Sequence, residues 1–372
     1  MISVEKIEKV LIVGLGLIGG SIAKAIKKYY PQIMVVGVDL DGRSIGLALS
    51  DGVLDGQISD MSYSGYFDLT FLCSPVMNVV ASAKKYVSYS CRGGIITDVG
   101  SAKEAIVKTL DYLNDEGYNF IGGHPMAGSE KWGYENSTDN LFYGCYYVLT
   151  PTSKTDTSAY LKLYEFISGL GARVVTLEVS EHDYAVAITS HLPQIISTSL
   201  VRLAMEQSKS EGSLRLLAAG GFKDLTRIAS GNPEIWKQIL IENSSLVRRA
   251  LELYIKQLSE LGEKVSKRDE KGILDYLISS RNFREEIIEA STQKEEITTM
   301  KVKVMNKPGE LGRILGKIGS KGINIEDIEI IHHPEEGYGI MSIMVSGTAD
   351  FKKARALMKS LDILMEDGQE VP

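Results

Sequence analysis

Short apolar runs alternate with helical patterns over about the first 175 residues. Several runs, such as VLIVG and LTFLC, are continuously apolar. Strands buried on both faces have this pattern, and parallel sheets covered by helices supply them. Strands that alternate with helices predict βαβ units and a doubly wound α/β sheet. The candidate strands are Lys9–Gly14, Ile33–Asp39, Leu69–Ser74, Gly94–Val99, Asn119–Gly123, Tyr146–Thr150 and Arg173–Leu177.

After about residue 180 the pattern is helical, with no convincing strand for more than a hundred residues. Glycines and proline interrupt it at three places: Gly220-Gly221, Gly231-Asn232-Pro233 and Gly262. It ends in two charged stretches, Glu263–Lys271 and Arg281–Glu296, which we interpret as solvated helix faces. We expect an α/β domain over residues 1–178 and an all-α domain over residues 179–296.

A third pattern begins at Ile297 with the alternating run ITTMKVKVM. The elements expected after it are a helix to about Lys321, strands at Asn324–Ile331 and Gly339–Ser346, a helix at Asp350–Leu361 and a short strand near Ile363–Glu366. This βαββαβ order is typical of a ferredoxin-like unit. It predicts a third domain over residues 297–372.

Composition adds limits on function. The 372 residues are 44% hydrophobic and 24% charged, which predicts a globular protein of two or three domains. No apolar run approaches the roughly 18–20 residues of a membrane span, and the N-terminus lacks the pattern of a secretory signal. The net charge of −7 argues against nucleic acid as a partner. Three cysteines without CxxC spacing indicate a reducing compartment, so we expect a cytoplasmic protein with no nucleic-acid or membrane partner.

The motif GLGLIG follows a predicted strand and opens a predicted helix, and Asp39 ends the next strand. This context is that of the Rossmann-type dinucleotide fingerprint, in which glycines permit the turn and the helix N-terminus receives the phosphates. A carboxylate at Asp39 favours NAD, although the nearby Arg43 could accommodate NADP. The candidate cofactor-binding residues are Gly14, Gly16, Leu17, Ile18, Gly19, Asp39, Ser74 and Pro75.

Two further motifs follow predicted strands, where open α/β sheets bind ligands. In DVGSAK, Ser101 could face a ligand, or it could cap a helix in a capping box with Glu104. In GGHPMAGSE, we expect His124 in a loop at the active edge of the sheet rather than in the core. A neutral imidazole there is suited to accept a proton from a substrate hydroxyl.

The helical region contains SHLP, with His191, and GGFKDLTRIASGNPEIW. Asp224 and Arg227 lie three residues apart and could form a surface salt bridge. Alternatively, Arg227 could bind an anionic substrate, because guanidinium groups bind carboxylates bidentately. His332 and His333 have no third ligand at metal spacing, so we expect no metal site.

Taken together, GLGLIGGS, DVGSAK, GGHPMAGSE, SHLPQ and GGFKDLTRIASGNPEIW resemble prephenate dehydrogenase, and NKPGELGRIL with KGINIEDIEI resembles an ACT regulatory domain. The resemblance implies NAD-dependent oxidation of prephenate to 4-hydroxyphenylpyruvate, carbon dioxide and NADH, on the route to tyrosine. It also implies a homodimer formed through the helical domain. Gly231 departs from relatives that carry Ser at this position.

Residue roles follow from the same resemblance. His124 would accept the proton of the ring hydroxyl, and Ser101 would hydrogen-bond that hydroxyl. Arg227 would bind a substrate carboxylate. The remaining implied substrate-binding residues are His191, Ser129, Glu130, Asp224 and Trp236.

ACT domains commonly bind amino acids at the first loop and across a paired sheet, which implies L-tyrosine as an inhibitory effector. The corresponding residues are Asn306, Gly309, Leu311, Asn324 and Ile325. A pure dimerisation module is the alternative for this domain. For the whole chain there are three alternatives. Arogenate dehydrogenases share most of the motifs, so this activity stays open. Another hydroxyacid dehydrogenase would leave the HPMAGSE motif unexplained, and a non-catalytic amino-acid sensor would leave the glycine fingerprint and His124 unexplained.

Overall fold

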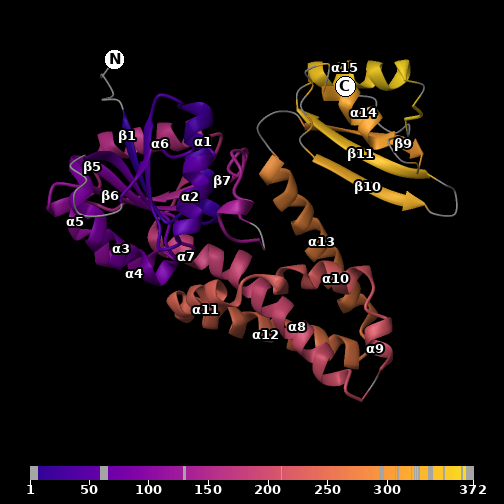
Figure 1. The fold of residues 1–372 in the computed structure, drawn as a ribbon. Coiled ribbons are helices and arrows are strands. Elements are labelled where there is room, and N and C mark those ends of the chain that lie inside the picture. The colour runs from indigo at the N-terminus through magenta and orange to yellow at the C-terminus, as the bar shows by residue number, and fades with distance from the viewer. Residues whose placement is uncertain are drawn as a thin grey trace. The chain divides into compact units, whose positions relative to one another are not determined.

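In the computed structural model the chain divides into two compact units, Met1–Gln257 and Leu258–Pro372. Figure 1 shows the elements of each unit. The structure describes residues 7–58, 66–128, 131–210, 212–292, 297–305, 307, 310–319, 321, 323, 325, 327–333, 338–346, 348–361 and 363–365.

The first unit contains, within the described residues, an eight-stranded sheet of order β3-β2-β1-β4-β5-β6-β7-β8. Neighbouring strands are parallel except β6 and β7, which are antiparallel. The strand order reverses between β1 and β4, and open α/β sheets bind ligands at such a point. The strands are β1 (Lys9–Val13), β2 (Met34–Val38), β3 (Gly56–Gln57), β4 (Phe67–Leu72), β5 (Ser90–Asp98), β6 (Asn119–Pro125), β7 (Tyr146–Thr150) and β8 (Arg173–Thr176).

Helices cover both faces of this sheet. Val10 and Ile12 of β1 lie in one apolar core with α1, α2 and α6, whereas Leu11 and Val13 lie in a second core with α3, α4 and α5. Successive strand side chains point to opposite faces, so burial of both faces explains the continuous apolar runs. The helices are α1 (Leu17–Tyr29), α2 (Gly42–Ser50), α3 (Val79–Tyr86), α4 (Glu104–Leu110), α5 (Tyr112–Asp115) and α6 (Thr157–Gly169).

All seven predicted strands of this unit are confirmed, with shifted ends; β5, for example, begins at Ser90 rather than Gly94. The two-residue strand β3 is absent from the prediction because so short a segment has no readable period. The antiparallel pairing of β6 with β7 was not expected either.

The described residues from the end of β8 to Thr292 form helices joined by short turns, with no strand among them. The expected break at Gly262 is wrong, because α12 continues through this exposed glycine. A single glycine costs an exposed helix only about 1 kcal/mol, which a long helix tolerates. Of the described helices, none has the length and apolar character that crossing a membrane requires. The elements are α7 (Val179–Val186), a π-helical turn (Ala187–His191), α8 (Leu192–Gln207), α9 (Ser213–Leu216), α10 (Gly220–Thr226), α11 (Pro233–Glu242), α12 (Ser244–Ser266) and α13 (Glu270–Thr292).

The second unit contains an antiparallel sheet whose described strands have the order β10-β11-β9. Helices α14 and α15 share an apolar core with this sheet, which includes Val302, Ile314, Met341 and Met358. The predicted order of strands and helices is confirmed, but the last strand is reduced to a bridge between Met365 and Val302. The elements are β9 (Ile297–Met305), α14 (Glu310–Gly319), β10 (Asp327–His333), β11 (Tyr338–Ser346) and α15 (Thr348–Ser360).

Candidate active site

The three fingerprint glycines have distinct surroundings at the C-terminal end of β1. Gly14 has φ of 99°, and a Cβ atom there would lie 2.7 Å from the carbonyl oxygen of Cys73. A Cβ atom at Gly19 would collide with the carbonyl oxygen of Gly14, so α1 packs directly on the turn. At Gly16 a Cβ atom would have no described atom within 4 Å. Only Gly16 therefore borders open space, as close approach of a ligand to the backbone requires.

The N-terminus of α1 is suited to bind an anion. Its N-cap residue is Gly16, no described side chain caps it, and its first turn has no acidic residue. The first N–H groups of a helix lack partners within the helix, and its dipole favours negative charge at this end. A pyrophosphate fits these features.

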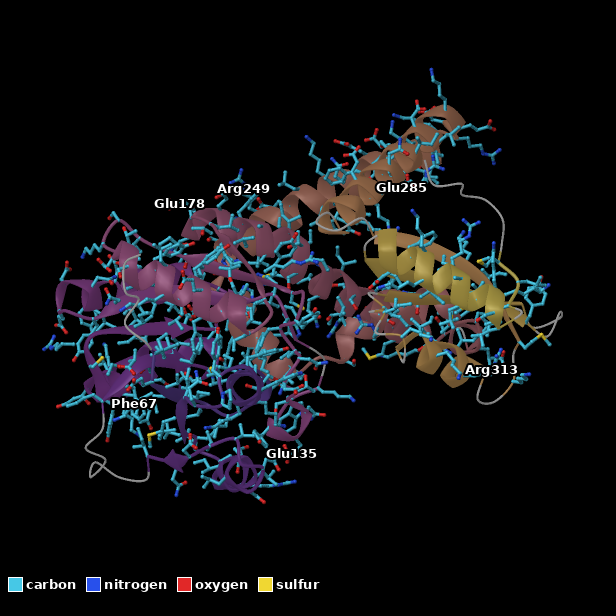
Figure 2. All side chains as sticks on the ribbon, turned by 90° about the horizontal axis from the view of Figure 1, so that it is seen from above. Phe67, Glu135, Glu178, Arg249, Glu285 and Arg313 are labelled. Atoms are coloured by element: carbon cyan, nitrogen blue, oxygen red, sulfur yellow. The ribbon has the colours of Figure 1, made fainter. Side chains whose placement is uncertain are left out.

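Asp39 lies directly after β2 and beside the glycine turn. Its Oδ2 accepts a hydrogen bond from the N–H of Leu15, and its Oδ1 accepts one from the N–H of Asp41 at 2.8 Å. The carboxylate is therefore fixed where the fingerprint places a ribose. Arg43 forms an ion pair with Glu135, labelled in Figure 2, with 2.9 Å between Nη2 and Oε1.

Ser74 and Pro75 follow β4, which pairs with β1. The Ser74 hydroxyl lies 3.0 Å from the Ser82 hydroxyl, and Pro75 is exposed. Both therefore lie at the same edge of the sheet as the glycine turn.

His124 is the penultimate residue of β6, paired with Val148 of β7, rather than part of a loop as expected. Its side chain is buried, and its Nδ1 lies 2.8 Å from Nε2 of His182. Burial lowers the pKa of His124 well below its usual value, and the neighbouring basic side chains of His182 and Lys103 act in the same direction. The imidazole is therefore neutral at pH 7 and can accept a proton.

His182 connects His124 to Asp183, and both residues lie on α7. The Nδ1 atom of His182 lies 2.7 Å from Oδ1 of Asp183. The Asp183 carboxylate also accepts the backbone N–H groups of Lys103 and Glu104, each at 2.8 Å. Burial opposes ionisation, but these hydrogen bonds, that from His182 foremost, hold the pKa of Asp183 below its usual value.

A second buried pair fixes the backbone next to His124. Lys103 forms an ion pair with Asp98, and both side chains are fully buried. Its Nζ also donates to the carbonyl oxygen of Gly123 at 2.8 Å, while Asp98 accepts the N–H groups of Gly100 and Gly123. This network ties the end of β5 to β6 and so positions His124.

Ser101 lies between the buried Asp98 and Lys103. The alternative in which Ser101 caps a helix is wrong, because α4 begins at Glu104 and its N-cap residue is Lys103. Ser101 is half-buried, and its hydroxyl has no hydrogen-bond partner among the described residues. The hydroxyl therefore stays available to a ligand.

His191 ends the π-helical turn before α8, and such turns occur frequently at functional sites. Its Nδ1 lies 3.2 Å from Nδ2 of Asn243, which also donates to the backbone carbonyl of Asp183. The buried Nε2 has no partner among the described residues. Because the amide of Asn243 donates to Nδ1, the proton of a neutral His191 is on Nε2. Burial is the main cause that lowers its pKa, to about 4.

Trp236 on α11 packs edge-on against His191, with ring centroids 6.2 Å apart. A Cβ atom at Gly231 would lie 2.7 Å from Nε1 of Trp236, so a serine there would displace this ring. Asp224 on α10 and Arg227 in the turn after it are exposed in the single chain, and this segment packs against α8.

Several expected residues lie outside the described part of the chain: Ser129, Glu130, Asn306, Gly309 and Asn324. The side chains of Leu311, His332 and His333 also lie outside it. Ile325 is half-buried against the core of the second unit.

None of the sequence motifs contains His182, Asp183 or Asn243. Their only signal in the sequence is the adjacent pair His182-Asp183. Its distance from His124 along the chain does not indicate that the two segments are in contact. The DVGSAK motif also contains Asp98 and Lys103, but from the sequence it predicted a role for Ser101 alone.

Three family models match the chain. Residues 22–176 match the prephenate dehydrogenase nucleotide-binding domain, residues 178–279 the prephenate dehydrogenase dimerization domain, and residues 298–362 the ACT domain. The match to the first domain agrees with the glycine turn and Asp39 in indicating NAD as the cofactor.

Similar proteins cover most of the chain. A prephenate dehydrogenase of Bacillus subtilis is 32% identical over 95% of this chain and 96% of its own length. A crystal structure of prephenate dehydrogenase from A. aeolicus, in complex with hydroxyphenyl propionate and NAD+, has a TM-score of 0.72 at 34% identity and covers 76% of this chain and 99% of that one. Synechocystis arogenate dehydrogenase has a TM-score of 0.66 at 30% identity, over 75% of this chain and 99% of that one. The chain therefore belongs to the prephenate dehydrogenase family.

Proposed function

We propose that this protein catalyses the NAD-dependent oxidative decarboxylation of prephenate to 4-hydroxyphenylpyruvate. The observation that carries the proposal is the neutral, buried His124, held by hydrogen bonds at the same sheet edge as the dinucleotide turn. NAD, when bound, supplies a two-electron acceptor for the hydride on the hydroxyl-bearing carbon.

His124 accepts the proton of the substrate hydroxyl as the hydride leaves the same carbon. Ser101, whose hydroxyl lacks a described partner, donates to or accepts from that hydroxyl and orients it. The carbonyl that forms withdraws electrons from the ring, the bond to the ring carboxylate breaks, and carbon dioxide leaves. The aromatic product needs a proton on its oxygen, which protonated His124 returns.

The substrate dianion requires positive or hydrogen-bond-donating groups. His191 presents Nε2–H as a buried donor without a described acceptor, which suits a substrate oxygen. Arg227 is assigned to a substrate carboxylate, and Ser129, Glu130, Asp224 and Trp236 are also assigned to substrate binding, as the family membership implies. Leu17, Ile18, Ser74 and Pro75 are assigned to cofactor binding.

A homodimer is proposed through the helical region. Large apolar side chains of this region are exposed in the single chain, and the matching family model is a dimerization domain. They include Leu203 (55% exposed), Leu216 (88%), Leu217 (76%) and Leu225 (68%). Burial of such residues against a second copy removes apolar area from water. Because Leu225 neighbours Arg227, the second copy would also enclose this arginine.

We assign residues 1–178 to cofactor binding, 179–296 to substrate binding and dimerisation, and 297–372 to regulation. L-Tyrosine, the end product of the route, is the proposed effector of the regulatory domain. The match to an ACT domain supports this assignment.

The test is the appearance of reduced-nicotinamide absorbance with purified full-length protein. Prephenate and arogenate are each supplied with NAD and with NADP. Fastest turnover with prephenate and NAD is expected. Preference for arogenate would support the arogenate dehydrogenase alternative, and no turnover of either would support a non-catalytic sensor.

A further inference from the structure

We propose that His182 and Asp183 are positioning residues that hold His124 in the ring tautomer needed for proton acceptance and balance the charge that His124 gains. The inference rests on the proposed function, because it assigns His124 as the acceptor of the substrate proton. It adds two residues to the site that the sequence motifs do not contain.

The three side chains form a continuous buried chain. His124 on β6 contacts His182 on α7 with 2.8 Å between Nδ1 and Nε2. His182 contacts Asp183 with 2.7 Å between Nδ1 and Oδ1. The rings of His124 and His182 meet edge-on, with an interplanar angle of 78°. All three side chains are at least nine-tenths buried, so water does not compete for these hydrogen bonds.

The direction of each hydrogen bond follows from Asp183. An ionised carboxylate only accepts hydrogen bonds, so Nδ1 of His182 carries a proton. In neutral His182 the other ring atom, Nε2, is then an acceptor, and Nδ1 of His124 must donate to it. A neutral His124 with a proton on Nδ1 has a free electron pair on Nε2. That atom is therefore the one ready to accept a proton.

The carboxylate of Asp183 is held by more than His182. The backbone N–H groups of Lys103 and Glu104 both donate to it at 2.8 Å. These amides lie two and three residues after Ser101, so one carboxylate fixes both the proton acceptor and the turn that carries the Ser101 hydroxyl. An amide side chain at this position could not accept all three hydrogen bonds, because one of its two polar atoms is a donor.

Charge balance gives the second reason. The overall reaction returns to the product oxygen the proton taken from the substrate hydroxyl, so the enzyme needs to hold this proton only within one turnover. Protonated His124 is a buried cation, and the titratable side chains around it include Lys103, His182 and His191, all basic. Lys103 is already paired with Asp98. Asp183 is thus the carboxylate connected to His124 through hydrogen bonds.

The competing explanation is that His182 only packs against His124. Packing alone predicts that substitutions of similar shape preserve the reaction. The proposed role predicts that the rate depends on whether residues 182 and 183 can accept hydrogen bonds. The substitutions below keep a similar side-chain shape and change this ability.

The first test uses full-length variants. Asp183→Asn is expected to lower kcat about 10²–10⁴-fold; in catalytic triads the same change lowers kcat about 10⁴-fold. The reason is that an amide N–H can donate to Nδ1 of His182, which reverses the direction of both hydrogen bonds. The proton of neutral His124 is then on Nε2, the atom that should accept the substrate proton. KM for prephenate should stay within about threefold. The acid limb of kcat/KM should move to lower pH, since loss of a negative charge disfavours protonated His124. The control is Asp51→Asn, whose carboxylate accepts from the hydroxyl of Tyr134 away from this chain of residues.

The second test separates hydrogen bonding from packing at position 182. The Oε1 atom of Gln can accept from Nδ1 of His124, whereas Leu cannot. His182→Gln is therefore expected to keep at least about tenfold more activity than His182→Leu. Equal activities in the two variants would support packing alone.

The closing measurement needs no substrate. Ring nitrogen NMR of protein labelled in its five histidines reports which nitrogen of His124 carries the proton. We expect the proton on Nδ1 in the wild type and a shift towards Nε2 in Asp183→Asn. A proton on Nε2 in the wild type, or an unchanged tautomer together with unchanged kcat in Asp183→Asn, would overturn the inference. Failure of the proposed function is distinct, because it would appear as no turnover of prephenate by a wild type with the expected tautomer.

Discussion

A Cβ atom at Gly19 would collide with the carbonyl oxygen of Gly14, so helix α1 and the turn after β1 are in backbone contact. Gly19→Ala is therefore expected to destabilise the protein by about 1–3 kcal/mol, as overpacked sites do, and to lower Tm. Gly16→Ala should leave Tm almost unchanged, because its Cβ atom would meet open space, yet weaken NAD binding at least about tenfold by blocking the pyrophosphate. Thermal unfolding and an NAD titration measure both effects. NAD binding by Gly16→Ala as tight as that of the wild type would contradict the proposed contact.

NAD should be preferred over NADP. Asp39 is fixed beside the glycine turn, where it would face a 2′-phosphate, and like charges brought together in a binding site cost several kcal/mol. Arg43, the residue that could favour NADP, is paired with Glu135. We expect kcat/KM to be at least about 100-fold higher with NAD, and Asp39→Asn to reduce this ratio. Comparable values for the two cofactors in the wild type would shift the assignment to Arg43.

His124→Asn is expected to lower kcat about 10²–10⁴-fold with little change in KM, as loss of a general base does. In the wild type, kcat/KM should fall on the acid side. Because burial lowers the pKa of His124, this decline should lie below pH 6.5. Steady-state rates across pH 5–8 provide the measurement. More than about a tenth of the activity remaining in His124→Asn would make this residue structural.

Stability should decrease as pH falls from about 6.5 towards 4. Burial lowers the pKa of His191 to about 4, whereas a histidine in the unfolded chain titrates near 6.5. Between these values the unfolded state binds a proton that the folded state does not, which costs the folded state on the order of 3 kcal/mol. Denaturant unfolding can be followed by tryptophan fluorescence, since both tryptophans, Trp132 and Trp236, lie in the first unit. His191→Asn should show a smaller dependence on pH; equal slopes would contradict a buried, neutral His191.

L-Tyrosine should inhibit through the C-terminal domain. A chain ending at residue 296 is expected to keep its activity, because the two matched prephenate dehydrogenase domains, residues 22–176 and 178–279, both end before that point. The shortened chain should lose the part of the inhibition that acts at a distance. Such control requires tyrosine to bind one conformation of the enzyme more tightly than another. Rates of both chains over a series of tyrosine concentrations test this, and equal inhibition would place tyrosine in the catalytic pocket.

The cofactor turn could be predicted from sequence because its parts are local. Gly14, Gly16 and Gly19 lie within six residues, and their roles depend on one turn and one helix start. The order of strands and helices is similarly readable, because apolar periodicity records which faces are buried. Even so, a continuous helix through Gly262 shows that a breaker residue alone does not end a long helix.

The chain of His124, His182 and Asp183 was decided by tertiary structure alone. His182 lies 58 residues after His124, and Asp183 lies 80 residues after Lys103, whose N–H it accepts. No periodicity relates such positions, because the contact arises only when α7 packs beside the ends of β5 and β6. The sequence determined which residues could carry proton transfer and cofactor binding. The packed fold decided which of them touch, since hydrogen bonds of 2.7–2.8 Å between distant segments require the whole domain to form first.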